Sequence, residues 1–349
     1  MRFPLKTQRT LAGDLTKRAG RGGQTEGVTD LRVPPLFAAR APRVLGEEAV
    51  PWLAALPDLA AEYARKWGCA FEGAAMHGYV GVVQPARLAD GTPVVLKLGW
   101  RDEESADEPL ALSTWAGRGA VRLLESAPDD GVLLLERLDA GRTLDNLPLR
   151  SAIPVIGGLA RRLAVPAPAS MRRHLRSEAG SLVEELPRRW ATLGEPFDKR
   201  LVDDAVAICR ELGPSAGELL VNEDLHFQNV LAGTREPWLV IDPKPLAGDL
   251  EWGVIPLFWN RFSESTLDER FALIVASQEL DADKARAWTL VRAVQNWIWM
   301  LEEYEESGED SDDPAFVTVT SGASPRAGGS ATRTPERPVA EIATWAASR

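Results

Sequence analysis

The hydrophobic pattern of the chain changes character near residue 139, and this change narrows the folds open to it. Before that point, apolar residues gather in short runs typical of β-strands, at 78–88, 93–100, 119–125 and 131–138. Beyond it, apolar residues recur at i, i+3 and i+4, the spacing of helices that bury one face. A length of 349 residues suffices for two lobes, each with its own core. The sequence therefore predicts an α+β fold in which a small antiparallel lobe, with at least these four strands, precedes a larger helical lobe.

A tight turn joins two of these runs. Asp90 and Gly91 separate 78–88 from 93–100, and an Asp-Gly pair between apolar runs is a strong hairpin signal. The second run, PVVLKLGW, carries Lys97 among apolar residues. Such a lysine lies either at the rim of the sheet or at a functional position, because a buried lysine needs a partner. We favour a function for Lys97.

The two ends of the chain differ in composition from its middle. Residues 1–40 hold eight basic and three acidic side chains without periodicity, and we interpret them as a flexible basic extension. Residues 302–313 hold eight acids and no bases, and residues 317–349 are rich in Ser, Thr, Ala, Pro and Gly. We therefore interpret 305–349 as an acidic, then low-complexity tail. The predicted lobes are then 41–138 and 139–304.

Composition narrows the class of partner. The chain carries 51 acidic and 40 basic side chains, a net charge of −11, so nucleic acid meets net repulsion and a small neutral or cationic molecule fits better. No apolar stretch reaches the roughly 18 residues of a membrane span, and the N-terminus lacks the apolar core of a secretory signal. Cys69 and Cys209 stand alone and form neither a disulfide framework nor a zinc motif. We expect a cytoplasmic protein with a small-molecule partner, and the oligomeric state is left open.

The stretch most informative about chemistry is LLVNEDLHFQNVLAG at 219–233. Asp224 and Asn229 lie in a loop between two apolar runs, and Asp242 closes the next strand-like run, WLVID. Phosphoryl transfer needs a carboxylate that accepts the proton of the attacking hydroxyl, and oxygen ligands for Mg²⁺. Asp224 can supply the first, and Asn229 and Asp242 the second. Each residue alone is typical of a turn or a helix cap, but their joint spacing favours the kinase layout.

These motifs resemble the aminoglycoside phosphotransferase family, which shares its fold with protein kinases. The wording REPWLVIDPKPLAGD at 235–249 is similar to the branch of streptomycin 6-kinases and hydroxyurea phosphotransferases, as are DGTPVVLKL at 90–98 and WAGRGAVRLLE at 115–125. The resemblance covers about residues 45–304. It implies a bilobal protein-kinase-like fold, in which the small lobe has a five-stranded antiparallel sheet and residues 41–138 bind the nucleotide. It also implies transfer of the ATP γ-phosphate, with Mg²⁺, to a hydroxyl of an aminoglycoside or to hydroxyurea, giving antibiotic resistance.

The resemblance also implies roles for single residues. Asp224 is then the catalytic base, and Asn229 and Asp242 are the metal ligands. Lys97 contacts the α- and β-phosphates, and Glu108 pairs with Lys97 and holds it in place. The phosphate-binding loop contains Gly78 and Gly81, since glycine lets the backbone approach phosphate closely; two glycines near a strand are also typical of a bulge. The hinge that binds adenine through its backbone is formed by Leu135, Glu136, Arg137 and Leu138.

Acidic residues after the metal strand are candidates for substrate binding. Asp249 and Glu251 could face the substrate and attract a cationic aminoglycoside. The alternative is that both lie at a solvated helix N-terminus, where acids are favoured. His226 lies inside the loop, and we interpret it as a bracing residue rather than a base.

The chain departs from the family pattern at three places. Asn222 stands where members commonly carry His, and Gly253 stands where many carry Asp. In the fold these two positions lie close together, so the two changes could be a matched replacement. Pro243 and Lys244 follow the metal-binding aspartate, and these two residues are typical of the streptomycin 6-kinase and hydroxyurea phosphotransferase branch.

Other functions remain open at this point. The acceptor could be a different small hydroxylated metabolite. The changes at Asn222 and Gly253 also permit an inert nucleotide-binding pseudokinase, although Lys97, Asp224 and Asp242 are retained. A protein kinase is disfavoured, because no activation segment with an APE-like ending follows Asp242.

Overall fold

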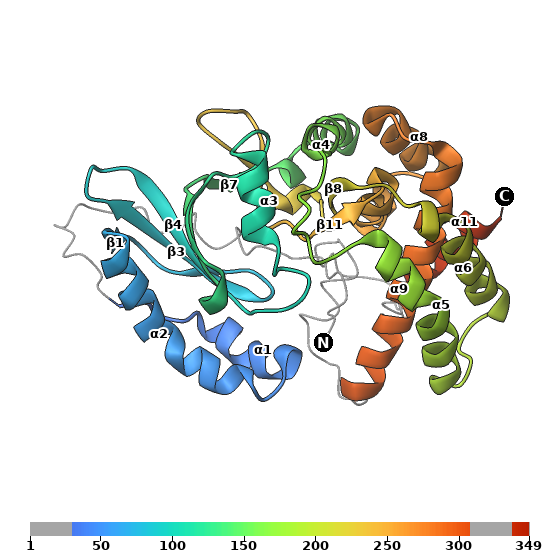
Figure 1. Cartoon of the computed structure of the whole chain (residues 1–349), viewed down its shortest axis with the longest axis horizontal. Helices are drawn as coiled ribbons and strands as arrows, with labels where there is room; N and C mark the ends of the chain where they lie inside the picture. The colour runs from blue at the N-terminus through green and yellow to red at the C-terminus, as the bar shows by residue number, and fades with distance from the viewer. Residues whose placement is uncertain (1–29, 308–336, 349) are drawn as a thin grey trace, which may run out of the picture.

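A computed structural model describes residues 30–307 and 337–348 of the protein. Two lobes lie side by side along the longest axis (Figure 1), with the strands of the N-terminal lobe at one end and a group of helices at the other. The predicted α+β, bilobal architecture is confirmed. In the described part of the chain, no helix is both long and apolar enough to cross a membrane.

The N-terminal lobe is built on an antiparallel sheet with strand order β1-β3-β4-β6-β5, in which β2 also pairs with β3. This sheet has six strands rather than the five expected, because β1 and β2 are too short to show an alternating pattern. Its elements are α1 (Pro35–Leu45), α2 (Ala49–Lys66), β1 (Cys69–Phe71), β2 (Met76–His77), β3 (Gly81–Leu88), β4 (Pro93–Gly99), α3 (Glu108–Trp115), β5 (Leu123–Ala127) and β6 (Val132–Glu136).

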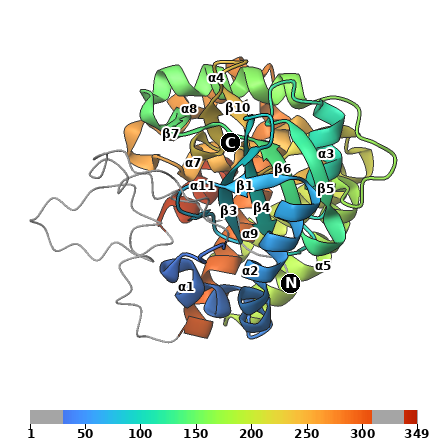
Figure 2. The same cartoon turned by 90° about the vertical axis from the view of Figure 1, so that its left-hand side faces the viewer.

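Buried and half-buried side chains alternate along β4, and this alternation decides on which face of the sheet Lys97 lies. Val94, Leu96 and Leu98 are fully or almost fully buried in the core that the sheet shares with α1 and α2. Figure 2 shows α2 lying in front of the sheet. Because successive side chains of a strand face opposite sides, Lys97 lies on the other face, toward the larger lobe. Burial of a side chain such as Leu96 stabilises the lobe by about 1.5–3 kcal/mol.

The prediction that residues 1–40 form a flexible extension is wrong for residues 30–40. Residue 40 falls inside α1, and Leu31 and Phe37 are 3% and 0% exposed in the core of the sheet. Proline residues around and within α1 hide its helical pattern in the sequence, but a proline in the first turn of a helix costs no hydrogen bond. Residues 1–29 lie outside the described residues.

The expected C-terminal tail is likewise wrong over its last part. Helix α11 (Arg337–Ala347) packs along α9 (Ala282–Ser307) and buries Val339, Ile342 and Ala346. This amphipathic helix is short and comes after a long polar stretch, so composition averaged over the tail conceals it. The remainder of the predicted tail, 308–336, is outside the described residues.

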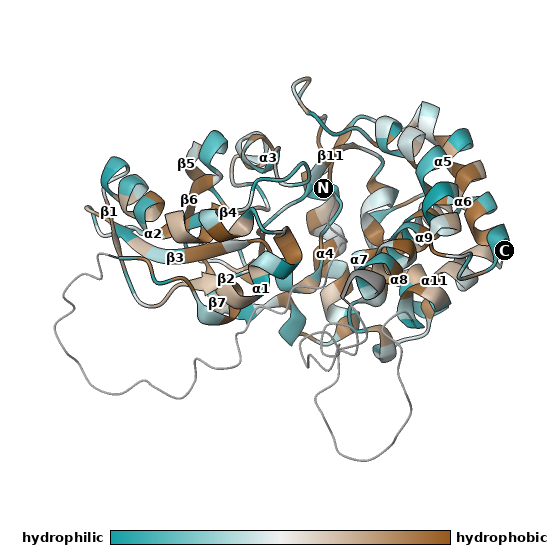
Figure 3. Cartoon of the chain, turned by 90° about the horizontal axis from the view of Figure 1, so that it is seen from below, coloured by the Kyte–Doolittle hydropathy of each residue, from teal (hydrophilic) through white to brown (hydrophobic). Residues whose placement is uncertain are grey.

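The larger lobe combines helices with short strand pairs. It begins with a strand, β7, where a helix was expected, and β7 joins β9 and β10 in one sheet while β8 and β11 form another. Figure 3 shows hydrophilic residues on the outer helices α5 and α6. The elements not yet given are β7 (Asp139–Thr143), α4 (Leu149–Leu163), α5 (Leu175–Thr192), α6 (Lys199–Leu212), β8 (Leu219–Asn222), β9 (Val230–Ala232), β10 (Leu239–Val240), β11 (Pro245–Gly248), the 3-10 helix η6 (Leu250–Val254), α7 (Pro256–Trp259) and α8 (Leu267–Gln278).

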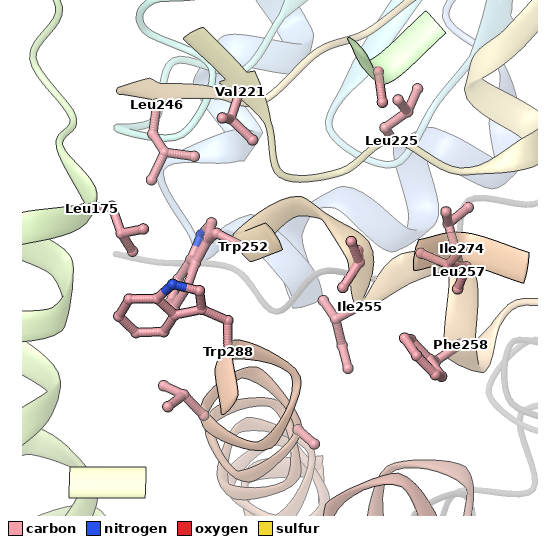
Figure 4. Close-up of a cluster of buried hydrophobic side chains, with 14 of the residues drawn as sticks. Leu175, Val221, Leu225, Leu246, Trp252, Ile255, Leu257, Phe258, Ile274 and Trp288 are labelled. Atoms are coloured by element: carbon pink, nitrogen blue, oxygen red, sulfur yellow. The ribbon is translucent and has the colours of Figure 1, made fainter. Parts of the chain in front are cut away.

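A tryptophan pair anchors the strands to the helices. Trp252 and Trp288 meet edge to face, with ring centroids 5.2 Å apart and an interplanar angle of 85°. Val221 of β8 and Leu246 of β11 lie above the pair (Figure 4), and all four side chains are buried. Aromatic pairs of this geometry stabilise by about 0.5–1.5 kcal/mol beyond the area they bury. The core thus fixes the two strands from which the loops of the site emerge.

Candidate active site

Lys97 is the centre of an ion cluster that joins the two lobes. Its Nζ lies 2.6 Å from each carboxylate oxygen of Glu108, at the start of α3, and 2.6 Å from Oδ1 of Asp242, which follows β10. The three side chains are 13%, 5% and 28% exposed. The structure therefore brings together the predicted lysine, its predicted partner and one predicted metal ligand.

The ion cluster holds more carboxylates than ammonium groups. Burial opposes the charged form of Lys97, but Asp242 and Glu108 outweigh it and raise the pKa of the ammonium, so Lys97 stays protonated. Burial also raises the pKa of Glu108; Lys97 lowers it in part and Asp242 raises it again, which leaves it at about 7. Two carboxylates share one ammonium. An additional cation at Asp242 would relieve this imbalance.

Hydrogen bonds fix the loop of residues 222–229, which connects β8 to β9. The side-chain Oδ1 of Asn222 accepts from the N–H of Asp224 at 3.1 Å and from the N–H of Lys244 at 3.0 Å. At the other end, Nδ2 of Asn229 donates to the carbonyl of Asp224 at 3.2 Å. Asp224 is thus held on both sides by short polar side chains of its own loop.

Strand pairing places Asn229 beside Asp242. Val230 pairs with Val240 in the β9–β10 hairpin, and the N–H of Ile241 donates to the carbonyl of Asn229 at 2.9 Å. The two predicted metal ligands therefore stand at the same end of one hairpin. The backbone of Asp242 is left-handed, with φ of 49°, a conformation that aspartate tolerates better than most residues.

The residues present fit Mg²⁺ bound together with phosphates. The described residues contain no group of three or more His, Cys, Asp and Glu side chains that could enclose a metal. Mg²⁺ is commonly held by one or two protein oxygen ligands plus substrate phosphates and water. The amide nitrogen of Asn229 is engaged by the backbone, so its side-chain oxygen is the atom suited to a cation.

The carboxyl of Asp224 is poised to take a proton near neutral pH. Burial raises its pKa; Lys244 lowers it in part, while Asp242 and other acids raise it again, and it lies at about 7. His226 Nε2 is 3.9 Å from Asp224 Oδ1. Burial lowers the pKa of His226 to about 4, so its ring is neutral. In the described part of the chain, however, neither buried ring nitrogen of His226 has a hydrogen-bond partner, so the predicted bracing by its side chain is wrong. The raised pKa of Asp224 suits the role predicted for it, that of the base.

The predicted phosphate loop is a tight turn between β2 and β3. The N–H of Gly78 donates to the carbonyl of Gly81 at 2.9 Å. A Cβ on Gly81 would lie 2.9 Å from the carbonyl oxygen of Leu98, so no larger residue fits there. Arg40 of α1 donates through Nη2 to the carbonyls of Gly78 and Tyr79, at 3.0 and 2.9 Å. Sequence reasoning missed Arg40, because it assigned that residue to an unstructured extension.

The predicted hinge begins at the end of β6. The carboxylate of Glu136 contacts Arg235, with a shortest separation of 2.6 Å, and accepts the N–H of Arg122 at 2.7 Å. Leu138 packs against the core of the larger lobe. These side chains therefore join the lobes, and only the backbone of the segment remains for the predicted contact with adenine.

The predicted substrate contact of Asp249 is wrong in position, whereas that of half-buried Glu251 stays a prediction. Asp249 is 4% exposed, and its carboxylate accepts from the N–H of Gly217 at 2.8 Å and from Trp288 Nε1 at 3.1 Å. Lys284 Nζ lies 2.6 Å from the same carboxylate. Glu251 accepts the N–H of Asp281 before α9. Both acids support the junction of η6 with α9 through these contacts.

A buried ion network beneath the loop was not predicted. Glu223 is 1% exposed; Arg173 lies 2.6 Å and Arg292 3.2 Å from its carboxylate, and Trp252 Nε1 donates to it at 2.9 Å. Burial alone would raise the pKa of Glu223, but the two arginines lower it to about 2. The one signal in the sequence was Arg292 within the largely apolar stretch WTLVRAV at 288–294, which gives no partner.

The departures from the family pattern lie in contact, as expected. A Cβ on Gly253 would meet the carbonyl oxygen of Asn222 at 2.9 Å and Val221 at 3.1 Å. The backbone of β8 therefore rests directly on η6, with no room for an aspartate at 253. Asn222 takes over the bracing through its side chain.

The fold is shared with phosphotransferases that act on small molecules. The solved structure of aminoglycoside phosphotransferase APH(4)-Ia, a thermostable mutant in a ternary complex with ADP and hygromycin B, matches with a TM-score of 0.53. The match covers 82% of this chain and 98% of that chain at 14% identity. At this identity the likeness shows the fold alone. The protein thus has the protein-kinase-like fold of this class of enzymes.

Sequence relatives narrow this class to a family. The family described as aminoglycoside/hydroxyurea antibiotic resistance kinase matches residues 66–303. The hydroxyurea phosphotransferase of Kitasatospora aureofaciens is 46% identical over 72% of this chain and 74% of its own length. The streptomycin 6-kinase of Streptomyces glaucescens is 40% identical over 83% of this chain and 96% of its own length. The chain belongs to the aminoglycoside/hydroxyurea antibiotic resistance kinase family, and the predicted family is confirmed.

Proposed function

We propose that the protein transfers the γ-phosphate of ATP to a hydroxyl of a streptomycin-like aminocyclitol or to hydroxyurea. The observation that carries the proposal is the convergence of Asp224, Asn229 and Asp242 from two neighbouring loops, with Lys97 reaching Asp242 from the other lobe. The substrate class rests on the relatives at 46% and 40% identity. A cytoplasmic location, where ATP is abundant, belongs to this proposal.

Each residue has a defined task in the proposed reaction. Lys97, held by Glu108, orients the α- and β-phosphates. Asn229 and Asp242 hold Mg²⁺, which neutralises phosphate charge when bound. Asp224 orients the acceptor hydroxyl and takes its proton. The residues act by positioning and by charge, and no covalent enzyme intermediate is needed.

The test is a screen of acceptors with purified protein and Mg-ATP. Streptomycin, hydroxyurea, another aminoglycoside and a simple polyol are compared, and mass spectrometry detects the added phosphoryl group. We expect phosphorylation of streptomycin or hydroxyurea, and its loss in Asp224→Asn. A wild-type protein that consumes ATP but phosphorylates only the polyol would show that the acceptor is another hydroxylated metabolite. Tight ATP binding without any product would identify the inert pseudokinase instead.

A further inference from the structure

Lys244 lies beside Asp224, yet none of the roles above uses its side chain. It stands between β10 and β11, two residues after Asp242. Its N–H donates to Asn222 Oδ1 at 3.0 Å, and its carbonyl accepts the N–H of Glu223 at 3.0 Å. Both bonds go to the loop that carries Asp224. The backbone of Lys244 is therefore fixed relative to that carboxylate.

The side chain of Lys244 reaches toward the smaller lobe. Its Nζ lies 2.7 Å from Glu104 Oε2, and the two side chains are 14% and 4% exposed. Glu104 belongs to the connection between β4 and α3, so this ion pair crosses between the lobes. Lys244 is also the charge that lowers the pKa of Asp224 against the effect of burial. The ammonium is thus close enough to Asp224 to act on it electrostatically.

Acidic residues surround Asp224, so a cation is needed at this end of the site to bind a phosphate. Asp242, Glu104 and Glu223 all act on Asp224 as like charges. A γ-phosphate that approached this group would meet the same repulsion. His226 is neutral, because burial lowers its pKa to about 4. Lys97 is committed to Glu108 and Asp242.

Stability is a weak explanation for the Lys244–Glu104 pair. A buried ion pair is often no more stabilising than apolar residues of the same volume, because desolvation offsets the attraction. The pair moreover holds its ammonium within electrostatic reach of the Asp224 carboxylate, on which the acceptor hydroxyl would lie. A cation at that position gains most when negative charge develops during transfer.

We propose that Lys244 is a catalytic residue that binds the transferred phosphoryl group, and that Glu104 is a positioning residue that holds its ammonium; this rests on the proposed kinase function. In the step, the acceptor oxygen forms a bond to the γ-phosphorus. The bond from that phosphorus to the bridging oxygen breaks, and its electron pair leaves with ADP. The hydroxyl proton goes to Asp224. Lys244 keeps its protons and donates hydrogen bonds to non-bridging phosphoryl oxygens.

The experiment compares Lys244→Met, Lys244→Arg and Glu104→Gln in the full-length chain. We expect Lys244→Met to lower kcat by about 10²-fold, the usual effect of removing one donor to developing charge. The dissociation constant of ADP should stay within about twofold, because the nucleotide keeps its other contacts. Lys244→Arg should recover at least about tenfold of the lost rate, since its charge is retained. Glu104→Gln should lower kcat less than Lys244→Met does.

Lys284→Met is the matched control, because Lys284 forms an equally short ion pair with Asp249 in the same lobe. It should reduce thermal stability and leave kcat of the folded protein unchanged. The proposal is overturned if Lys244→Met keeps kcat within about threefold of wild type, or if Lys244→Arg is no better than Lys244→Met. If Lys244→Met does not fold, the Lys244→Arg variant alone decides. A Lys244→Arg protein that melts like wild type but has a kcat about 10²-fold lower overturns the proposal, because its retained charge then gives no benefit.

The same assays separate this proposal from the proposed acceptor. Mg²⁺-dependent hydrolysis of ATP, with water as the acceptor, is measured beside acceptor phosphorylation for every variant. A wild-type protein that hydrolyses ATP but phosphorylates neither streptomycin nor hydroxyurea overturns the acceptor alone, and the Lys244 variants are then judged on hydrolysis. A wild-type protein with neither activity overturns both.

Discussion

Two buried aspartates of the larger lobe, Asp224 and Asp249, have nearly equal exposure and opposite surroundings. Asp249, 4% exposed, receives hydrogen bonds from Gly217 and Trp288 and an ion pair from Lys284. Its negative charge is fully partnered. Such a carboxylate holds structure together, here the junction of η6 with α9.

Asp224, 3% exposed, has no such partners among the residues that the structure describes. Within residues 30–307 and 337–348 its carboxylate accepts no hydrogen bond, and Lys244 opposes the three acids that raise its pKa. The comparison teaches that burial does not distinguish a functional acid from a structural one. The balance of charge and hydrogen bonds around the acid does.

The largest effect should come from Asp224→Asn. The variant removes the base, and kcat should fall by about 10²–10⁴-fold. Its melting temperature should be retained or raised, because an uncompensated buried charge is removed. Phosphorylation rates and a thermal melt check both parts. A variant that melts far below wild type would mean that Asp224 is structural after all.

Asp249→Ala should show the opposite behaviour. The loss of hydrogen bonds to a buried carboxylate should lower the free energy of unfolding by about 2–3 kcal/mol. The kcat of the folded fraction should stay within about threefold of wild type, because the residue is remote from the reacting groups. Urea unfolding and steady-state kinetics are the measurements. A large drop in kcat at full stability would restore Asp249 as a substrate contact.

The pH dependence of the rate should separate the two acids. Burial raises the pKa of Asp224 to about 7, and the base must be ionised to accept the hydroxyl proton. The rate should therefore rise about tenfold per pH unit below 7 and level off above it. Asp249→Ala should give the same profile. A wild-type rate that is flat from pH 5 to about 8 would contradict the assignment.

The smallest effect should come from His226→Asn. Burial keeps the His226 ring neutral, with a pKa of about 4, so it is not the group that titrates near 7. The variant should keep the pH midpoint of the wild type, and its kcat should fall by less than the roughly 10²-fold expected for loss of a base. A midpoint that moves or vanishes would transfer the base role to His226.

Much of the fold followed from local pattern. The alternation of β4 and the Asp90-Gly91 turn predicted the central hairpin, which the structure forms between Gln84 and Leu96 among other pairs. Strands β1 and β2 and helix α11 were missed, since elements this short or this isolated acquire their identity from what they pack against. Arg40 was missed for the same reason.

The sequence by itself determined which chemical groups are available: the D-x4-N spacing of Asp224 and Asn229, the strand-terminal Asp242, and a lysine in an apolar strand. Tertiary structure decided which acids act. It turned Asp249 into the core and surrounded Asp224 with like charges, and it brought Lys244 to Glu104 across 140 residues of chain. Residue type is a local property, whereas the pKa and orientation of a carboxyl depend on charges and burial supplied by distant segments.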